Sequence, residues 1–268
     1  MKQSDIVFLS HGGGPLPLLG DPDHEALAQY LTTLGQSLKR PDAIVVFSAH
    51  WESQDVRITA QSSPELLYDY SGFPAETYQI QYPSSGAPDL AKQVSAELSK
   101  AGIANQLEHE RGFDHGVFVP LKLMFPQADV PVIQVSLLHS LDAAKHIAIG
   151  KALQPLLEQN LLFIGSGFSF HNMRAFFSSL SHQDEEKNLA FEDWLKDVCT
   201  DESLNESQRE SILANWQDAP YARFCHPREE HLLPLHVCYG LAGRAADSHE
   251  SVKVLGKQAG MFHWLSSR

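Results

Sequence analysis

The sequence predicts one α/β domain over residues 1–268, with a central, mostly parallel β-sheet flanked by helices. Short runs of strand type alternate along the chain with longer segments of helical spacing, as in α/β proteins. The sequence contains no internal repeat, low-complexity tract or obvious linker. Its 268 residues, 43% of them hydrophobic, suffice for one large core. These three observations favour a single domain.

Six short runs are expected to form the strands of the sheet. The first reads "IVFLS", and the second, "AIVVFSA", also combines branched and aromatic residues. The expected strands of the sheet are Ile6–Ser10, Ala43–Ala49, Val56–Ala60, Asn105–His109, Val130–Leu137 and Leu161–Gly165. Two further runs near the end of the chain, Val252–Leu255 and Gly260–Trp264, predict a hairpin.

Seven segments have the spacing of helices. The second of them is followed by Gly102, a residue type that favours helix ends, and the last begins just after Pro227. The expected helices are His24–Leu38, Ala87–Lys100, Gly116–Met124, Leu141–Gln159, Glu185–Val198, Ser207–Trp216 and Glu229–Leu241. Residues 62–86 are rich in Ser, Pro, Gly and Tyr and predict a long loop, which in a compact domain is often functional.

The charge balance excludes two classes of partner. The chain carries 33 acidic against 20 basic residues, a net charge of −13. Nucleic acids and anionic membrane surfaces are bound by clustered Lys and Arg, so neither is expected as a partner. No apolar run approaches the length of a membrane span, and the N-terminal residues lack the apolar core of a signal peptide.

Cysteine usage indicates the compartment. Cys199, Cys225 and Cys238 are odd in number and show no CxxC spacing, which fits a reducing environment. We therefore expect a cytoplasmic protein, present as a monomer or a small homo-oligomer.

Histidine is the unusual residue type, with 14 in the chain. His11, His50 and His171 each follow an expected strand. Ligands of open α/β sheets collect beyond the carboxyl ends of the strands, so three histidines at this edge indicate a site. A histidine satisfied by a hydrogen bond inside the core is the alternative for each one.

Two further histidines have informative neighbours. His115 lies in "GFDHG", between flexible glycines and next to Asp114, and His231 lies in "REEHLLPL" at the start of an expected helix. Neutral imidazole is a ligand of Fe, Zn, Cu and Ni. The chain has neither HExxH nor paired cysteines, so a metal site would have to combine distant segments. Spacing alone leaves the metal site and separate structural histidines both open.

Seven motifs occur along the chain in this order: "SHGGGP", "SAHWES", "YDYSGFPAETYQIQYP", "GFDHGVFVPLKLMFP", "VPVIQVSL", "GSGFSFHNM" and "EEHLLPL". The same order is found in class III extradiol ring-cleavage dioxygenases, and the sequence resembles in particular their DOPA dioxygenase branch. The resemblance covers nearly the whole chain, and is weakest between residues 178 and 223 and after Ala242. It implies one α/β domain, one metal ion and O2-dependent opening of a catechol ring.

The resemblance also implies roles for single residues. His11 and His50 match the two strand-end metal ligands of the family. His231 matches the third ligand, which is a glutamate in more distant members. His171 matches a histidine at the metal that is either a further ligand or an acid/base. His115 matches the histidine that handles substrate and oxygen.

The resemblance implies Fe(II) for catalysis. The usual facial triad of such enzymes has two histidines and a carboxylate, so the all-histidine set in this chain is a departure. Such a set also binds Zn(II) well, and we expect zinc as an alternative occupant. A second departure is "HGGGP" in place of the more usual "HGSP", which changes the loop beneath the metal.

Ring cleavage beside two hydroxyls explains why these residue types are needed. Three protein ligands on one face leave room for both catechol oxygens and for O2. The substrate must lose protons to chelate the metal, and a later proton donation helps to break the O–O bond. His115 and His171 are the candidates for both transfers, and we expect Asp114 to orient one of them.

Aromatic residues of the long loop predict a binding wall for a flat ring. Tyr70, Phe73 and Tyr78, together with Trp51, are expected to stack on the substrate. The alternative is that these side chains only pack the loop onto the domain.

The expected function is a dioxygenase that inserts O2 into the ring of a small, DOPA-like catechol to give a ring-opened semialdehyde. One alternative is a zinc hydrolase on the same scaffold, with metal-bound water as nucleophile. Another is a non-catalytic metal-binding module that keeps the pocket. Metal content measured together with oxygen uptake separates the three.

Overall fold

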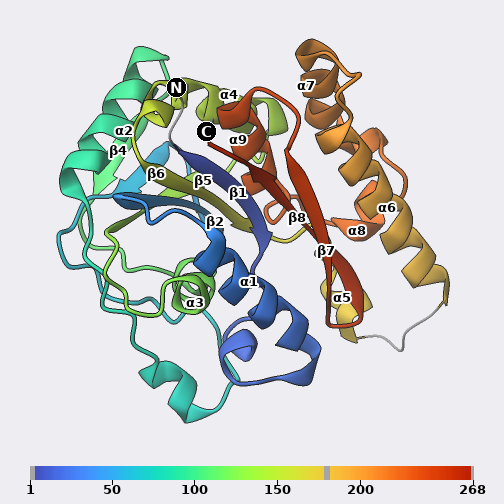
Figure 1. Cartoon of the computed structure of the whole chain (residues 1–268), viewed down its shortest axis with the longest axis horizontal. Helices are drawn as coiled ribbons and strands as arrows, with labels where there is room; N and C mark the ends of the chain where they lie inside the picture. The colour runs from blue at the N-terminus through green and yellow to red at the C-terminus, as the bar shows by residue number, and fades with distance from the viewer. Residues whose placement is uncertain (1–3, 178–181, 267–268) are drawn as a thin grey trace.

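One eight-stranded sheet organises residues 4–177 and 182–266, which the computed structural model describes (Figure 1). The strand order is β4-β3-β5-β2-β6-β1-β8-β7. The strands are β1 Asp5–Ser10, β2 Ala43–Ser53, β3 Val56–Thr59, β4 Asn105–Glu108, β5 Val132–Leu138, β6 Leu161–Gly167, β7 Ser248–Val254 and β8 Lys257–Trp264.

The centre of the sheet is parallel. Strands β5, β2, β6 and β1 run in one direction, so their carboxyl ends meet at one edge. At one side of this parallel centre, β3 pairs antiparallel with β5 and parallel with β4. At the other side, β8 pairs antiparallel with β1 and with β7. The predicted α/β class with a mostly parallel sheet is confirmed, as is the C-terminal hairpin, which is longer than expected.

Helices cover both faces of the sheet. α1 (Glu25–Ser37) and α3 (His115–Met124) pack on the face nearer the viewer in Figure 1, and α2 (Pro88–Lys100), α4 (Ala143–Ala152) and α9 (Leu233–Ala242) pack on the other. The remaining helices are α5 Met173–Phe177, α6 His182–Thr200, α7 Glu206–Ala214 and α8 Ala222–Cys225. Among the described residues, no helix is long and apolar enough to cross a membrane.

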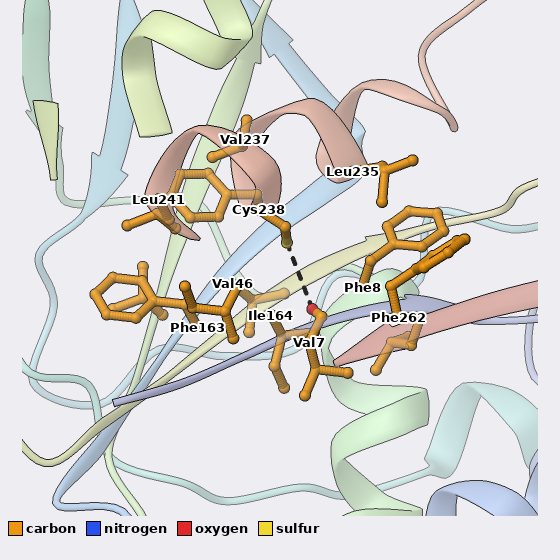
Figure 2. Packing of buried hydrophobic residues seen from close by; sticks show 14 of the residues in the cluster. Val7, Phe8, Val46, Phe163, Ile164, Leu235, Val237, Cys238, Leu241 and Phe262 are labelled. Atoms are coloured by element: carbon orange, nitrogen blue, oxygen red, sulfur yellow. Dashed lines mark hydrogen bonds between the residues drawn. The ribbon is translucent and has the colours of Figure 1, made fainter. Parts of the chain in front are cut away.

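Part of the hydrophobic core lies where α9 meets the sheet (Figure 2). The thiol of Cys238 on α9 donates to the carbonyl of Val7 on β1 over 3.5 Å. This close approach requires Gly165 on β6, because an added Cβ would lie 2.6 Å from both the Cys238 sulfur and the Pro234 carbonyl oxygen. Figure 2 labels residues of this part of the core on both faces of the sheet: Val7, Phe8, Val46, Phe163, Ile164, Leu235, Val237, Cys238, Leu241 and Phe262.

Two expected helices are shorter than the sequence pattern suggested. The segment expected as one helix from Leu141 to Gln159 divides into α4 and a 3₁₀ turn, Gln154–Glu158. Pro155 explains the break, because proline lacks the N–H that would continue the helix. Likewise α9 begins at Leu233 instead of Glu229, with Pro234 in its first turn.

Candidate metal centre

The position of His50 differs from the prediction that it follows a strand. β2 continues through His50 to Ser53, and its pairing with β5 shifts register between Phe47 and Glu52. Such a bulge bends a strand and redirects its side chains. The imidazole of His50 is 23% exposed, so the bulge presents a histidine at the carboxyl edge of the sheet.

His11 directly follows β1, as predicted, and is buried. The chain must then turn sharply, and Gly12 and Gly14 have φ of +84° and +55°, which L side chains rarely adopt. The backbone N–H of Gly13 donates to Nε2 of buried His24 over 3.0 Å. The three glycines therefore shape the loop that holds His11 in place.

His231 reaches the same edge from the turn before α9. The backbone N–H of Phe168 donates to the carbonyl of His231 over 2.9 Å. An added Cβ on Gly167 would lie 2.1 Å from that carbonyl oxygen. The glycine at the end of β6 thus allows the turn to lie against the sheet and places the third imidazole.

These three histidines form one cluster. Ligand nitrogens of His11, His50 and His231 lie within 4.8 Å of one another, and the Nε2 atoms of His11 and His50 are 3.0 Å apart. Nitrogens about 3 Å apart fit neighbouring ligands that are each about 2.1 Å from one ion.

A polar partner lies near Nδ1 of each of these histidines. Nδ1 of His11 is 2.9 Å from the Ser166 hydroxyl, and Nδ1 of His231 is 3.0 Å from a Glu230 carboxylate oxygen. Nδ1 of His50 is 3.5 Å from Asp69. Partners of this kind orient metal-binding histidines and leave Nε2 available for the ion.

The environment keeps all three imidazoles neutral. Burial, followed by the charges that neighbouring histidines would carry, holds the pKa values of His11 and His50 well below their usual range. The same causes lower the pKa of His231 to about 3, although Glu230 opposes the shift. Neutral imidazole is the form that binds metal, so the donor set fits a divalent ion such as Fe(II) or Zn(II).

His115 lies beside this cluster at the first position of α3. Its ring centroid is 3.9 Å from that of His50. Its Nδ1 and its backbone N–H lie 2.8 and 3.0 Å from the same oxygen of Asp69. Burial would raise the pKa of Asp69, but the hydrogen bonds from His115 outweigh it and lower that pKa. An ionised carboxylate therefore orients His115.

The predicted role of Asp114 as the orienting carboxylate is wrong. Asp114 occupies the N-cap position of α3 without a side-chain capping bond, and its carboxylate accepts hydrogen bonds from Ser48 at 2.7 Å, Arg111 at 3.1 Å and Gln134 instead of from a histidine. Burial raises its pKa. Helix geometry explains why Asp114 does not orient His115, because the side chain of the capping residue and that of the next residue point in different directions.

His171 lies at the margin of the cluster. Its ring stacks on His231 at 3.5 Å, and its Nδ1 is 3.2 Å from Glu230. Its nitrogens group with those two residues and not with His11 and His50. The loop explains this position, because His171 comes four residues after the end of β6. Metal binding by His171 stays a prediction, and this geometry favours an acid/base role.

A cavity of about 250 Å³ opens over the histidines. Tyr70 and Phe73 line it, as predicted from the sequence, together with the Gly12–Gly14 loop. Aromatic rings can stack on a flat ligand, so the site combines a metal-binding set with a surface for an aromatic ring.

Trp51 and Tyr78 do not line this cavity, in contrast to the prediction. Trp51 is buried under the guanidinium of Arg111 at 4.8 Å, and Arg111 also donates to the carbonyl of His50. Tyr78 packs on the outer side of Tyr70, with ring centroids 5.4 Å apart. Each of these two side chains therefore packs against a residue near the site, Arg111 or Tyr70, and does not reach the cavity.

Comparisons with known proteins identify the family. Residues 6–266 match the family described as "Catalytic LigB subunit of aromatic ring-opening dioxygenase". The chain belongs to this family.

Named relatives of this LigB-family chain agree. A protein named "Dioxygenase tasH" from Hapsidospora irregularis is 36% identical, with 100% of this chain and 87% of that protein covered. "4,5-DOPA dioxygenase extradiol" of Beta vulgaris is 35% identical over 89% and 87% of the two chains, and the protein of that name in Escherichia coli K12 is 33% identical over 97% and 92%.

A solved structure resembles the fold as well. The crystal structure of an uncharacterized Escherichia coli K12 protein superposes with a TM-score of 0.76 at 29% identity, covering 97% of this chain and 99% of that one. The predicted membership of the extradiol dioxygenases and the prediction of an oxidoreductase are confirmed. Members of the LigB family are metal-dependent, in agreement with the histidine cluster.

Sequence reasoning missed two carboxylates at this LigB-family site, Asp69 and Glu230. Burial opposes ionisation of Glu230, but hydrogen bonds from His171 and His231 outweigh it and hold its pKa well below the usual range. The only sequence signals were positions: Glu230 precedes His231, and Asp69 lies within the aromatic loop. Their contacts depend on tertiary structure.

We expect Glu230→Gln to weaken metal binding by roughly 10- to 100-fold, because outer partners of metal-binding histidines contribute that much. The amide lacks the charge that supports His171 and His231. A competition titration with a chelator measures the affinity. Glu229→Gln is the matched control, because Glu229 pairs with Arg223 at 2.6 Å and not with a histidine. Equal affinities of the two variants would contradict the role of Glu230.

Proposed function

We propose that this chain opens the ring of a catechol by adding both atoms of O2 beside the hydroxyls, giving a semialdehyde. The observation that carries this proposal is the convergence of three neutral imidazoles, from His11, His50 and His231, under an aromatic-lined cavity. DOPA, the compound in the names of five relatives, belongs to this substrate class.

Iron(II) is the metal that we propose for the reaction, bound by His11, His50 and His231. When bound, it supplies open positions for the substrate oxygens and O2 together with the redox chemistry that O2 requires. The same nitrogens suit Zn(II), which we propose as an alternative occupant without this activity.

His115 and His171 are the proposed proton carriers. His115 accepts a proton from a catechol hydroxyl at Nε2, since its Nδ1 is committed to Asp69. The ionised carboxylate of Asp69 stabilises the imidazolium that forms. His171 has the same arrangement with Glu230 at 3.2 Å, so it can return a proton when the O–O bond breaks.

We also propose partners, a cellular location and an oligomeric state. The acidic composition, with a net charge of −13, supports a small aromatic substrate and O2 as the partners in place of nucleic acid or a membrane. The free cysteines support a reducing, cytoplasmic location. We propose a monomer or a small homo-oligomer.

Oxygen uptake by anaerobically iron-loaded protein over a panel of catechols tests the activity. We expect stoichiometric O2 consumption and a yellow ring-opened product with at least one catechol, and none with zinc-loaded protein. Failure with every catechol, at full iron occupancy, would exclude this function. Activity that persists with zinc and without O2 would instead indicate a hydrolase.

A further inference from the structure

Part of the wall of the cavity is apolar. α5 supplies three side chains to it and the turn of the β7–β8 hairpin supplies one. Figure 1 shows α5 next to this turn. Among the described lining residues there is no Asp, Glu, Lys or Arg. The apolar side chains of this wall are Leu16, Phe168, Met173, Phe176, Phe177 and Leu255.

The arginines near the site are exposed or already paired. Arg174 of α5 is exposed and does not line the cavity. Arg228 forms two hydrogen bonds with Glu52, at 2.6 and 2.7 Å. Arg111 is bound to Asp114 and to the backbone of His50. None of these three arginines lines the cavity.

The size of the cavity leaves room beyond one ring. A cavity of roughly 150 Å³ suffices for benzene, and this one measures about 250 Å³. A catechol whose hydroxyls face the histidines directs a substituent at its 4-position away from them, toward α5. The substituent therefore meets the apolar wall.

We infer that the preferred substrate is a catechol with an apolar, uncharged substituent, and that Met173, Phe176 and Phe177 determine this specificity. The inference rests on the proposed catechol cleavage. A carboxylate or ammonium group would lose its hydration against this wall without gaining a partner, which is strongly unfavourable. An alkyl chain gains from the same burial. The amino-acid side chain of DOPA is thus a poor fit to this cavity.

Kinetics on a matched series test the inference. We compare kcat/KM for catechol, 4-methylcatechol, 4-ethylcatechol, 4-propylcatechol, DOPA and dopamine, and measure anaerobic dissociation constants for the same compounds. Along the alkyl series kcat/KM should rise with each methylene group, by at most roughly fourfold, the value for full burial. DOPA should fall at least tenfold below 4-propylcatechol. An equal or higher kcat/KM for DOPA would overturn the inference.

A positive charge at position 173 tests whether α5 determines the specificity. Met173 is 52% exposed at the rim, so Met173→Arg should fold normally. It should lower kcat/KM for 4-propylcatechol and raise it for 3,4-dihydroxyphenylacetate, reversing the preference of the unchanged protein. Leu189→Arg, at an exposed leucine of α6 outside the cavity, is the control and should change neither value. An unchanged preference in Met173→Arg would refute the assignment to α5.

The two proposals fail in different ways. If no catechol is cleaved at full iron occupancy, the proposed function is wrong, and tighter anaerobic binding of 4-propylcatechol than of DOPA would still support the apolar wall. If catechols are cleaved but charged and alkyl substituents are accepted equally, only the inference about specificity is wrong.

Discussion

His50→Ala should remove the bound metal and with it all ring-cleaving activity. The imidazole contributes one of three converging nitrogens, and its Nε2 is 3.0 Å from that of His11. Because metal binds the folded protein, it stabilises that state by about 2.7 kcal/mol at a free concentration of 100 times Kd. His50→Ala should lose both its bound metal and this stabilisation. The stabilisation is measured as the rise in unfolding free energy when metal is added.

His182→Ala is the control for this loss. His182 is 87% exposed on α6 and lies outside the cluster, so its removal should leave metal content and the metal-dependent increment unchanged. Full metal occupancy in His50→Ala would show that His50 is a core residue of the β2 bulge and not a ligand.

His115→Ala and His171→Ala should retain stoichiometric metal but lose roughly 10²- to 10⁴-fold in kcat, the usual contribution of a general acid or base. Both rings lie beside the three-histidine cluster, and each has a carboxylate at Nδ1, Asp69 or Glu230. Metal analysis and single-turnover kinetics on iron-loaded protein measure the two effects separately.

A different outcome for each variant would change the role assigned to that residue. If His171→Ala is metal-free, His171 is a fourth ligand, and the acid/base role belongs to His115 alone. If His115→Ala retains both metal and wild-type kcat, the pairing with Asp69 only fixes the start of α3.

Most of the fold was predictable because hydrophobic periodicity is a local property. Each central strand is a short apolar run, so its position followed from the residues themselves. The prediction failed where a proline or a bulge overrides the pattern: at Pro155, which ends the predicted long helix, and in β2, which continues past His50. A bulge has no local signature because it depends on pairing with β5.

By itself, the sequence determined the α/β class, the edge of the sheet at which histidines gather, and the order of motifs that resembles the extradiol dioxygenases. These features depend on residue type and on position along strands. Only the tertiary structure decided that Asp69 and Glu230, and not Asp114, orient the histidines. It also decided that Trp51 packs on Arg111 and does not line the cavity. Such contacts join segments as distant as Asp69 and His115, 46 residues apart. Their geometry follows from how loops pack on the sheet, which local patterns do not encode.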